Sequence, residues 1–408
     1  MTQSQSGQLL QGEELSFTER PTAVATVPDA VINDKYTRGE IRIVTEQARY
    51  PLNTIKALVE NPSYKMSPEY QRRHRWSVEQ KSRLIESLII NVPIPPIFLY
   101  EFDYSKYEVM DGLQRLTAIH DFYSDRFSLK GMTQWAELEG RTYTMLPEKI
   151  REGIDRRFLS SIILLKETAK SDDDALRLKQ LVFERLNSGG TKLEPQETRN
   201  AIFDGPLNQL CLRLSKNPSL CRLWDIPEPE QEELQGGAAS DARLANDDFR
   251  KMEDVELVLR FFAYRQKHHL HKGGVPLSRY YDDYLKYGNQ TFTPQVLDQL
   301  AMLFTDTITL VEDVLGERAF WLYRRRGQRW YWLARPTTAV FDPLMLAFSR
   351  HLQSGATLRS RASQLQDAMQ DFYVENYSSF EGRNVNPSIL AEREQKIDEL
   401  VSKILAVP

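Results

Sequence analysis

Short apolar segments alternate with segments of helical periodicity over the first half of this 408-residue chain, and this alternation restricts its fold. Four apolar segments are typical of strands, at residues 41–50, 95–100, 107–110 and 158–165. After residue 205 apolar residues recur at helical spacing, for example in 253–266 and 296–315. The pattern predicts an α+β protein, in which an α/β domain is followed by a lobe made of helices alone.

The predicted organisation has a flexible leader at residues 1–35, the α/β domain at 36–205 and the helical domain at 206–408. The leader has no basic start followed by an apolar run, which argues against a secretory signal. No later segment reaches the roughly 18 consecutive apolar residues that a membrane-crossing helix needs. We therefore expect a cytoplasmic protein without a membrane partner.

The formal net charge of −4 excludes a protein that is basic over its whole surface. Contact with nucleic acid would therefore depend on local basic patches. The two cysteines, Cys211 and Cys221, are too few for a disulfide framework or a four-thiolate zinc site. We predict that both are thiols of the hydrophobic core.

A strand-to-helix junction is predicted at Asp111–Gly112. Apolar residues at helical spacing follow it, which places Gln114 and Arg115 in the first turn of the helix. Glycine permits a ligand to approach the backbone closely, and a helix start offers unpaired N–H groups to an anion. Asp111 could orient a metal-bound water, hold a ribose hydroxyl or cap the helix, and the spacing leaves these roles open.

Two further polar segments interrupt the apolar pattern, Tyr70–Trp76 and Phe183–Thr191. The guanidinium groups of the first can bind phosphate, and a solvated basic turn is the alternative. Ser77 and Gln80 follow it in the spacing of a capping box, which predicts the start of a helix. The asparagine and glycines of the second segment can end a helix or approach a ligand at the strand-to-helix junction.

These three segments, in the order in which they follow one another along the chain, resemble the N-terminal-domain family of GmrSD-type modification-dependent restriction systems. That family carries a Tyr-Gln-Arg segment ending in Trp-Ser, an Asp-Gly-Gln-Gln-Arg motif and a Phe-x-Arg-Leu-Asn-x-Gly segment. The corresponding residues here are Tyr70–Ser77, Asp111–Arg115 and Phe183–Gly189. Further likeness lies in Arg83–Ser87, Pro93–Pro96 and Glu194–Asn200, so that the resemblance covers about residues 40–205.

The resemblance implies a ParB/sulfiredoxin-like fold for residues 36–205 and a role in bacterial defence against phage or modified DNA. It also implies that the domain binds a nucleoside triphosphate with Mg²⁺ and hydrolyses it weakly. Catalytic roles then fall on Asp111, Gln114 and Arg115. Nucleotide-binding roles fall on Gln71, Arg72, Arg75, Gly112, Asn187, Ser188 and Gly189. Leu113 stands where the family has its first Gln, which favours binding over hydrolysis.

Many relatives append a His-Asn-His nuclease domain, but none of the six histidines of this chain lies in the required pattern. His268, His269 and His271 lack Cys or acidic partners at ligand spacing, so we expect a solvated loop and no metal site. His74 and His120 are expected to pack or to cap. A partner nuclease or methyltransferase is then expected to complete the system.

The segment Arg318–Arg335 contains six arginines and no acidic residue, interleaved with aromatic residues. Guanidinium groups fit phosphate and aromatic faces accept bases. Candidate contacts to DNA are Arg324, Arg325, Arg326 and Arg329. The alternative is that the aromatic residues belong to the core while the arginines line a helix surface or a nucleotide pocket.

Three functions follow from these observations. The first is a nucleotide-binding, DNA-associated defence protein with weak NTPase activity and no nuclease domain of its own. The second is a non-enzymatic DNA-binding or scaffold protein that uses the Arg/aromatic segment, since fold likeness alone does not establish chemistry. The third is a nuclease whose site matches no motif considered above.

Overall fold

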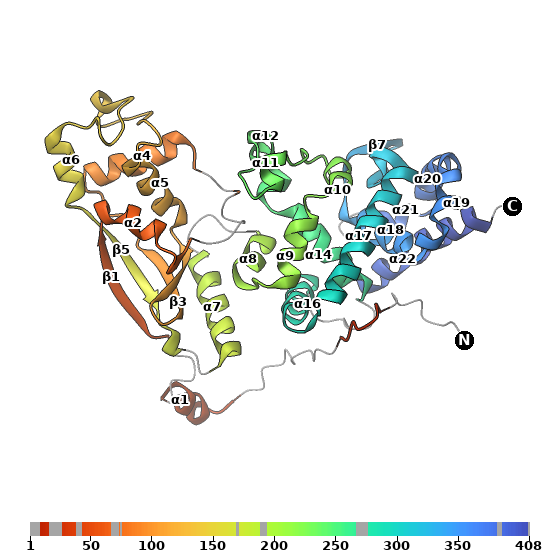
Figure 1. The fold of residues 1–408 in the computed structure, drawn as a ribbon. Coiled ribbons are helices and arrows are strands. Elements are labelled where there is room, and N and C mark those ends of the chain that lie inside the picture. Colours follow the sequence, from red (N-terminus) through yellow and green to blue (C-terminus); the bar gives the residue numbers. More distant parts are fainter. Residues whose placement is uncertain are drawn as a thin grey trace. The chain divides into compact units, whose positions relative to one another are not determined.

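The computed structural model consists of two compact units, Arg20–Ile202 and Met1–Glu19 together with Phe203–Pro408. The division falls beside the predicted domain boundary at residue 205. Residues described in the structure are 9–15, 27–37, 43–66, 73, 76–168, 171–187, 194–266, 276–381 and 386–406. Among these residues, none of the helices combines the length and the apolar character that crossing a membrane requires. Figure 1 shows the elements of each unit.

The first unit contains a mixed five-stranded sheet in the order β1-β5-β3-β4-β2. Its strands are β1 (Thr45–Pro51), β2 (Tyr64–Lys65), β3 (Ile97–Asp103), β4 (Lys106–Asp111) and β5 (Phe158–Leu164). β1 with β5 and β3 with β4 are antiparallel, whereas β3 with β5 and β2 with β4 are parallel. The four predicted strands are confirmed, and the short β2 is an addition to them.

The helical elements of the first unit are α1 (Asp29–Thr37), η1 (Leu52–Thr54), α2 (Ile55–Glu60), α4 (Val78–Ile89), α5 (Leu113–Tyr123), η2 (Ala136–Leu138), α6 (Glu148–Asp155), η3 (Lys166–Thr168), α7 (Asp172–Asn187) and α8 (Pro195–Ile202). Those from η1 to α6 pack on the sheet through one hydrophobic core (Figure 1). Fully buried Ile97 and Leu99 of β3 meet Leu116 and Ile119 of α5 in this core. The core thereby fixes the start of α5 against the sheet.

The second unit is built mainly of helices. They are α9 (Pro206–Leu214), α10 (Pro218–Leu223), α11 (Gln231–Leu234), α12 (Asp241–Ala245), α13 (Asp247–Arg250), α14 (Glu253–Arg265), α16 (Leu277–Thr291), α17 (Pro294–Leu315), η4 (Gly316–Arg318), α18 (Thr338–Arg350), η5 (Leu352–Ser354), α19 (Gly355–Ser360), α20 (Ala362–Glu375), α21 (Tyr377–Phe380) and α22 (Pro387–Ala406). Their core includes Phe304, Phe341 and Phe348, all fully buried. Cys211 and Cys221 are buried free thiols, as predicted.

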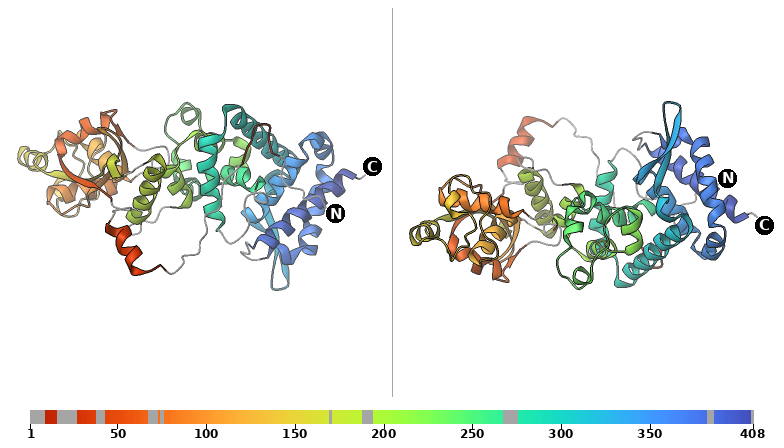
Figure 2. Two further views of the ribbon diagram at one scale, coloured as in Figure 1. Left: turned by 90° about the horizontal axis from the view of Figure 1, so that it is seen from below. Right: turned by 90° about the horizontal axis from the view of Figure 1, so that it is seen from above.

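The prediction that this unit consists of helices alone is wrong, because Arg318–Arg335 forms most of an antiparallel hairpin. Its strands are β6 (Trp321–Arg326) and β7 (Arg329–Pro336), joined at Gly327–Gln328. Gly327 has a φ of 63°, which a two-residue hairpin turn needs. Aromatic residues favour the extended backbone of the strands. In the right view of Figure 2 the hairpin extends beyond the helices of its unit.

Part of the predicted leader packs with the second unit. Residues 9–15 belong to that unit, and Glu13 is only 3% exposed. Both carboxylate oxygens of Glu13 accept hydrogen bonds of 2.6 Å from Arg265 of α14. A buried ion pair of this kind fixes the segment, because separating the two charges would leave one unpaired in the interior.

Candidate functional site

The strand-to-helix junction is formed as the sequence predicts, and Gly112 makes it possible. β4 ends at Asp111, and Gly112 is the N-cap residue of α5 with a φ of 96°. A Cβ atom at Gly112 would lie 2.4 Å from Cγ2 of Ile97, so a larger residue would need both a strained backbone and a displaced core side chain. Glycine is therefore required here by conformation and by space.

The start of α5 offers backbone donors. Gly112 provides no side-chain cap, and the first hydrogen bond of the helix runs from the N–H of Leu116 to the carbonyl of Gly112 at 3.0 Å. The N–H groups of residues 113–115 precede that bond and so have no partner within the helix. Together with the helix dipole they favour an anion at this position.

Arg115 is held across the junction by two contacts. Its Nη2 donates to Oδ2 of Asp111 at 2.7 Å and to the carbonyl of Pro96 at 3.3 Å. The Arg115 side chain is 15% exposed, whereas that of Asp111 is 49% exposed. Nε of Arg115 is buried and has no hydrogen-bond partner. Asp111 is thus the ion-pair partner of Arg115 and not the cap of α5, which removes one of the three roles left open by the sequence.

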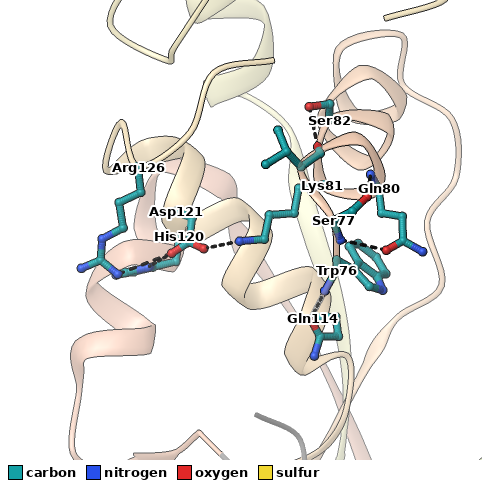
Figure 3. A network of polar contacts seen from close by, with 10 residues as sticks. Trp76, Ser77, Gln80, Lys81, Ser82, Gln114, His120, Asp121 and Arg126 are labelled. Atoms are coloured by element: carbon teal, nitrogen blue, oxygen red, sulfur yellow. Dashed lines mark hydrogen bonds and ion pairs between the residues drawn. The ribbon is translucent and has the colours of Figure 1, made fainter. Parts of the chain in front are cut away.

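Gln114 connects the junction to the first polar segment. Its Oε1 accepts a hydrogen bond of 3.2 Å from the backbone N–H of Trp76 (Figure 3). Trp76 packs partly buried against the hydrophobic core. The adjacent capping box is confirmed: the Ser77 side chain accepts from the N–H of Gln80, and the Gln80 side chain accepts from the N–H of Ser77. The side chains of Gln71, Arg72 and Arg75 lie outside the described residues.

A polar network fixes α4 against α5 behind the junction (Figure 3). Lys81 of α4 donates to Asp121 of α5 at 2.7 Å, and His120 and Arg126 contact the same carboxylate. Burial alone would raise the pKa of Asp121, but the hydrogen bond and charge of Lys81 lower it. His120 is 5% exposed and packs within this network. It therefore packs in the interior, which is one of the two expectations for this residue.

α7 leads to the third polar segment and contacts the strand that carries Asp111. Lys179 of α7 donates to Glu108 of β4 at 2.7 Å, with both side chains largely buried. α7 ends at Asn187. The side chain of Asn187 and residues Ser188 and Gly189 lie outside the described part of the chain.

α8 contributes a buried polar cluster to which the sequence analysis assigned no role. Gln196, Glu197, Arg199 and Asn200 are each at most 2% exposed. Gln196 donates to Asn200 at 3.1 Å and accepts from Arg199 at 3.2 Å. Buried polar groups cost free energy unless they are paired, so such a cluster marks a candidate functional element. The signal was four polar residues at helical spacing after a helix-opening Pro195.

Residues 55–203 match the model of the family described as GmrSD restriction endonuclease, N-terminal domain. This part of the chain is a GmrSD-type N-terminal domain. The match runs from α2 through α8 and includes the Asp111–Arg115 junction. It associates the chain with restriction systems. Neither a curated protein nor a solved structure matches the chain.

The described residues of the GmrSD-type domain do not by themselves form a metal site. No group of three or more His, Cys, Asp or Glu side chains suited to a metal ion occurs among the described residues. At the junction, Asp111 supplies one half-exposed carboxylate. Mg²⁺ is commonly held by one or two carboxylates together with nucleotide phosphates and water. The residues present therefore fit an ion that arrives with a nucleotide.

The predicted nucleic-acid contacts lie on the hairpin, outside the GmrSD-type domain. Arg324 is half-buried, whereas Arg325, Arg326 and Arg329 are exposed. Aromatic residues that flank these arginines are already in contact with other rings: Tyr323 stacks on Trp330, and Trp332 packs edge-on against Tyr373 of α20. The described aromatic side chains thus stabilise the hairpin, and the arginines at its tip are the groups that face solvent.

Proposed function

We propose that this chain is a restriction-system protein whose GmrSD-type domain binds a nucleoside triphosphate at the start of α5. The observation that carries the proposal is the left-handed Gly112 at the N-cap of α5, with Arg115 three residues later in the first turn of the helix. Phosphate oxygens would accept hydrogen bonds from the N–H groups of residues 113–115, and the Arg115 guanidinium would add a charge-assisted contact.

Asp111 and Gln114 have separate roles in this proposal. The Asp111 carboxylate would hold the Mg²⁺ that accompanies the phosphates, and Mg²⁺ would neutralise negative charge on them. Gln114 already accepts from the backbone of Trp76, so it would position the preceding segment beside the nucleotide. Leu113 places an apolar side chain where the family has Gln. Binding is therefore the main activity, and hydrolysis is slow.

Calorimetric titration of the full chain with ATP, GTP and CTP in the presence of Mg²⁺ tests nucleotide binding. Arg115→Ala is expected to weaken binding by roughly ten- to hundredfold, the usual worth of a hydrogen bond to a charged group. Arg156→Ala is the matched control, because Arg156 is an exposed arginine of the same unit at the end of α6. Absence of binding for all three nucleotides would contradict the proposal.

Leu113→Gln tests the hydrolytic part separately. Restoring the family motif is expected to raise the rate of phosphate release, while the affinity for nucleotide stays within about twofold, since only a step after binding changes. Phosphate release is measured under saturating nucleotide for the natural chain and the variant. An unchanged rate of phosphate release would contradict the idea that Leu113 limits hydrolysis at this motif. It would not contradict nucleotide binding.

The hairpin supports a second candidate function, contact with DNA. Arg326 and Arg329 pair directly across the turn of the hairpin, and both are exposed. DNA phosphates would release their counterions when they bind the arginines at the tip of the hairpin. The affinity for DNA should therefore fall steeply as the salt concentration rises. A non-enzymatic DNA-binding or scaffold protein would need only the exposed arginines of this hairpin and no nucleotide site.

Fluorescence anisotropy with a DNA duplex at increasing salt tests the hairpin. The variant Arg325→Ala/Arg326→Ala/Arg329→Ala is expected to bind more weakly and to lose about one unit of salt slope for each phosphate contact removed. Arg213→Ala, an exposed arginine on α9, is the control. Equal affinity and equal salt slope for the triple variant would exclude the hairpin as the contact. Plasmid cleavage with Mg²⁺ or Mn²⁺ would instead favour the nuclease alternative.

A further inference from the structure

The helical unit contains a cavity of about 590 Å³ outside the GmrSD-type domain. Its walls come from the β6–β7 hairpin, the start of α18, α21 and the first two turns of α22, with one residue each from α14 and α16. Cavities of several hundred Å³ suit small ligands. Leu277, Leu322, Leu333, Phe380 and Leu390 give it an apolar part. The rest of the lining includes four arginines and two acidic residues.

The N-terminus of α18 lies at this cavity. Thr337 is the N-cap residue, its Oγ1 accepts from the N–H of Ala339 at 3.3 Å, and Thr337, Thr338 and Ala339 all line the cavity. α18 is a helix of 13 residues, so its aligned peptide dipoles place a partial positive charge at this end. Such a terminus favours a bound anion.

Arg393 is the second and independent feature of the cavity. Its side chain is 3% exposed, and its Nε donates to the carbonyl of Ser379 at 2.6 Å. Its Nη2 is buried and has no hydrogen-bond partner. Burial lowers the pKa of the Arg393 guanidinium, because desolvation disfavours its charge. A buried donor without a partner is costly, and a ligand anion would satisfy it.

The other charged groups of the cavity leave an excess of positive charge. Arg260 is paired with Asp342, whose Oδ1 accepts from its Nε at 3.2 Å. Arg324 and Arg335 of the hairpin also line the cavity, and among the described residues neither has an acidic partner within ion-pair distance. Glu381 accepts a hydrogen bond from Tyr377 at 2.5 Å. Four arginines thus face two carboxylates, one of which is already paired.

We propose that this cavity binds a small phosphorylated ligand of mononucleotide size, with its phosphate at the start of α18 and in contact with Arg393. The apolar part of the wall accommodates the body of the ligand. Arg324 and Arg335 complete the neutralisation of the phosphate from the hairpin. A duplex backbone is too wide to bring its phosphates to a side chain as buried as Arg393, so the occupant is a small molecule rather than nucleic acid.

Substitution of Thr338 by Asp or Asn gives a matched pair of variants for the test. Asp at the first residue of a helix is favourable to the helix dipole, so Thr338→Asp should fold. Its carboxylate would occupy the phosphate position and repel the ligand, whereas Thr338→Asn has the same size and no charge. Arg335→Ala is the third variant, because Arg335 is exposed on the hairpin.

Calorimetry with AMP, inorganic phosphate and adenosine is carried out on the full chain and in an Arg115→Ala background, which separates this cavity from the proposed site at α5. We expect AMP and phosphate to bind and adenosine not to bind. Thr338→Asp should weaken AMP binding at least about tenfold, and Arg335→Ala by a smaller factor, while Thr338→Asn stays near the natural chain.

Two results would overturn the proposal: no binding of AMP or phosphate, or equal AMP affinity in Thr338→Asp and Thr338→Asn. Competition of AMP at this site by an oligonucleotide that lacks terminal phosphates would reassign the cavity to nucleic acid. Loss of AMP binding in Arg115→Ala alone, with Thr338→Asp unaffected, would instead place AMP at the GmrSD-type domain. The proposed function and the cavity can therefore fail separately.

Discussion

Two helices in this protein, α5 and α18, begin beside an arginine side chain, but the two arginines come from different places in the sequence. At α5 of the GmrSD-type domain, Arg115 is four residues along from its partner Asp111, and the N-cap is a glycine with no side chain. At α18 of the helical unit, the N-cap is Thr337, and the cavity arginine Arg393 comes from α22. The first arrangement is local in sequence. The second is assembled only when the chain folds.

The difference lies also in how the positive charge is balanced. The carboxylate at α5 is half-exposed, so water already solvates the ion pair and a ligand can exchange with it at low cost. At the cavity, the Arg260–Asp342 pair is largely buried, with exposed side-chain fractions of 14% and 4%. The proposed nucleotide site is therefore suited to reversible exchange, and the proposed cavity site depends on a pre-formed and rigid framework.

The largest expected effect concerns this framework. Asp342→Asn would leave the largely buried Arg260 with only its longer ion pair to Glu256, at 3.6 Å, and should destabilise the helical unit by about 4 kcal/mol. Asp111→Asn removes an exposed partner and should cost less than about 1 kcal/mol. Urea unfolding of both variants, with hydrogen exchange followed in α14 and α18, measures the difference. Equal losses of unfolding free energy in the two variants would mean that the difference in burial between the two ion pairs does not affect their contribution to stability.

A second prediction concerns the glycine at α5. Gly112→Ala is expected to destabilise the GmrSD-type domain by about 3 kcal/mol, because it combines a left-handed backbone with a clash against Ile97. Gly140→Ala is the control: Gly140 has a φ of 77° in the same unit, but its Cβ would meet nothing within 4 Å. It should cost about 1 kcal/mol from backbone strain alone. A Gly112→Ala variant as stable as Gly140→Ala would show that the Ile97 contact relaxes freely.

The sequence predicts the strand-to-helix junction before α5 well because its signals are local. Ser77 and Gln80 at capping-box spacing, and Gly112 between a strand and a helix, each determine a conformation within a few residues. The role of Asp111 could not be settled, since a residue beside a helix start can equally cap it or pair with a residue in its first turn. Only the geometry distinguishes the two.

The cavity site could not be predicted in the same way. Arg324, Thr338 and Arg393 come from three elements, and no periodicity in a sequence window links them. The hairpin itself was missed because three consecutive arginines obscure the alternation of its strands. Gly327–Gln328 was a usable turn signal between two aromatic-rich segments. Of the arginines in this segment, Arg324 and Arg335 line the cavity, whereas Arg325, Arg326 and Arg329 are exposed.

The smallest expected effect concerns Glu86 of the GmrSD-type domain. Its carboxylate is bound by backbone N–H groups, whereas the buried carboxylate of Asp342 in the helical unit is bound by an arginine. Glu86 of α4 is 5% exposed. It accepts hydrogen bonds from the N–H groups of Thr133, Gln134 and Trp135 at 2.7–3.0 Å, and from the Thr133 hydroxyl. Burial alone would raise the pKa of Glu86, but these hydrogen bonds outweigh it and the pKa is lowered from 4.5.

A carboxyl group whose pKa is lower in the folded chain stabilises the fold fully above its unfolded value and loses this contribution as the pH falls through the folded value. Glu86→Gln should therefore cost about 2 kcal/mol at neutral pH, and the difference from the natural chain should shrink below pH 4.5. Free energies of unfolding measured from pH 7 to pH 3 give this difference directly. Glu137→Gln, at an exposed position of the same unit, should show little effect throughout. A cost for Glu86→Gln that stays constant with pH would mean that its backbone hydrogen bonds do not depend on the charge, and that packing around the side chain fixes residues 133–135.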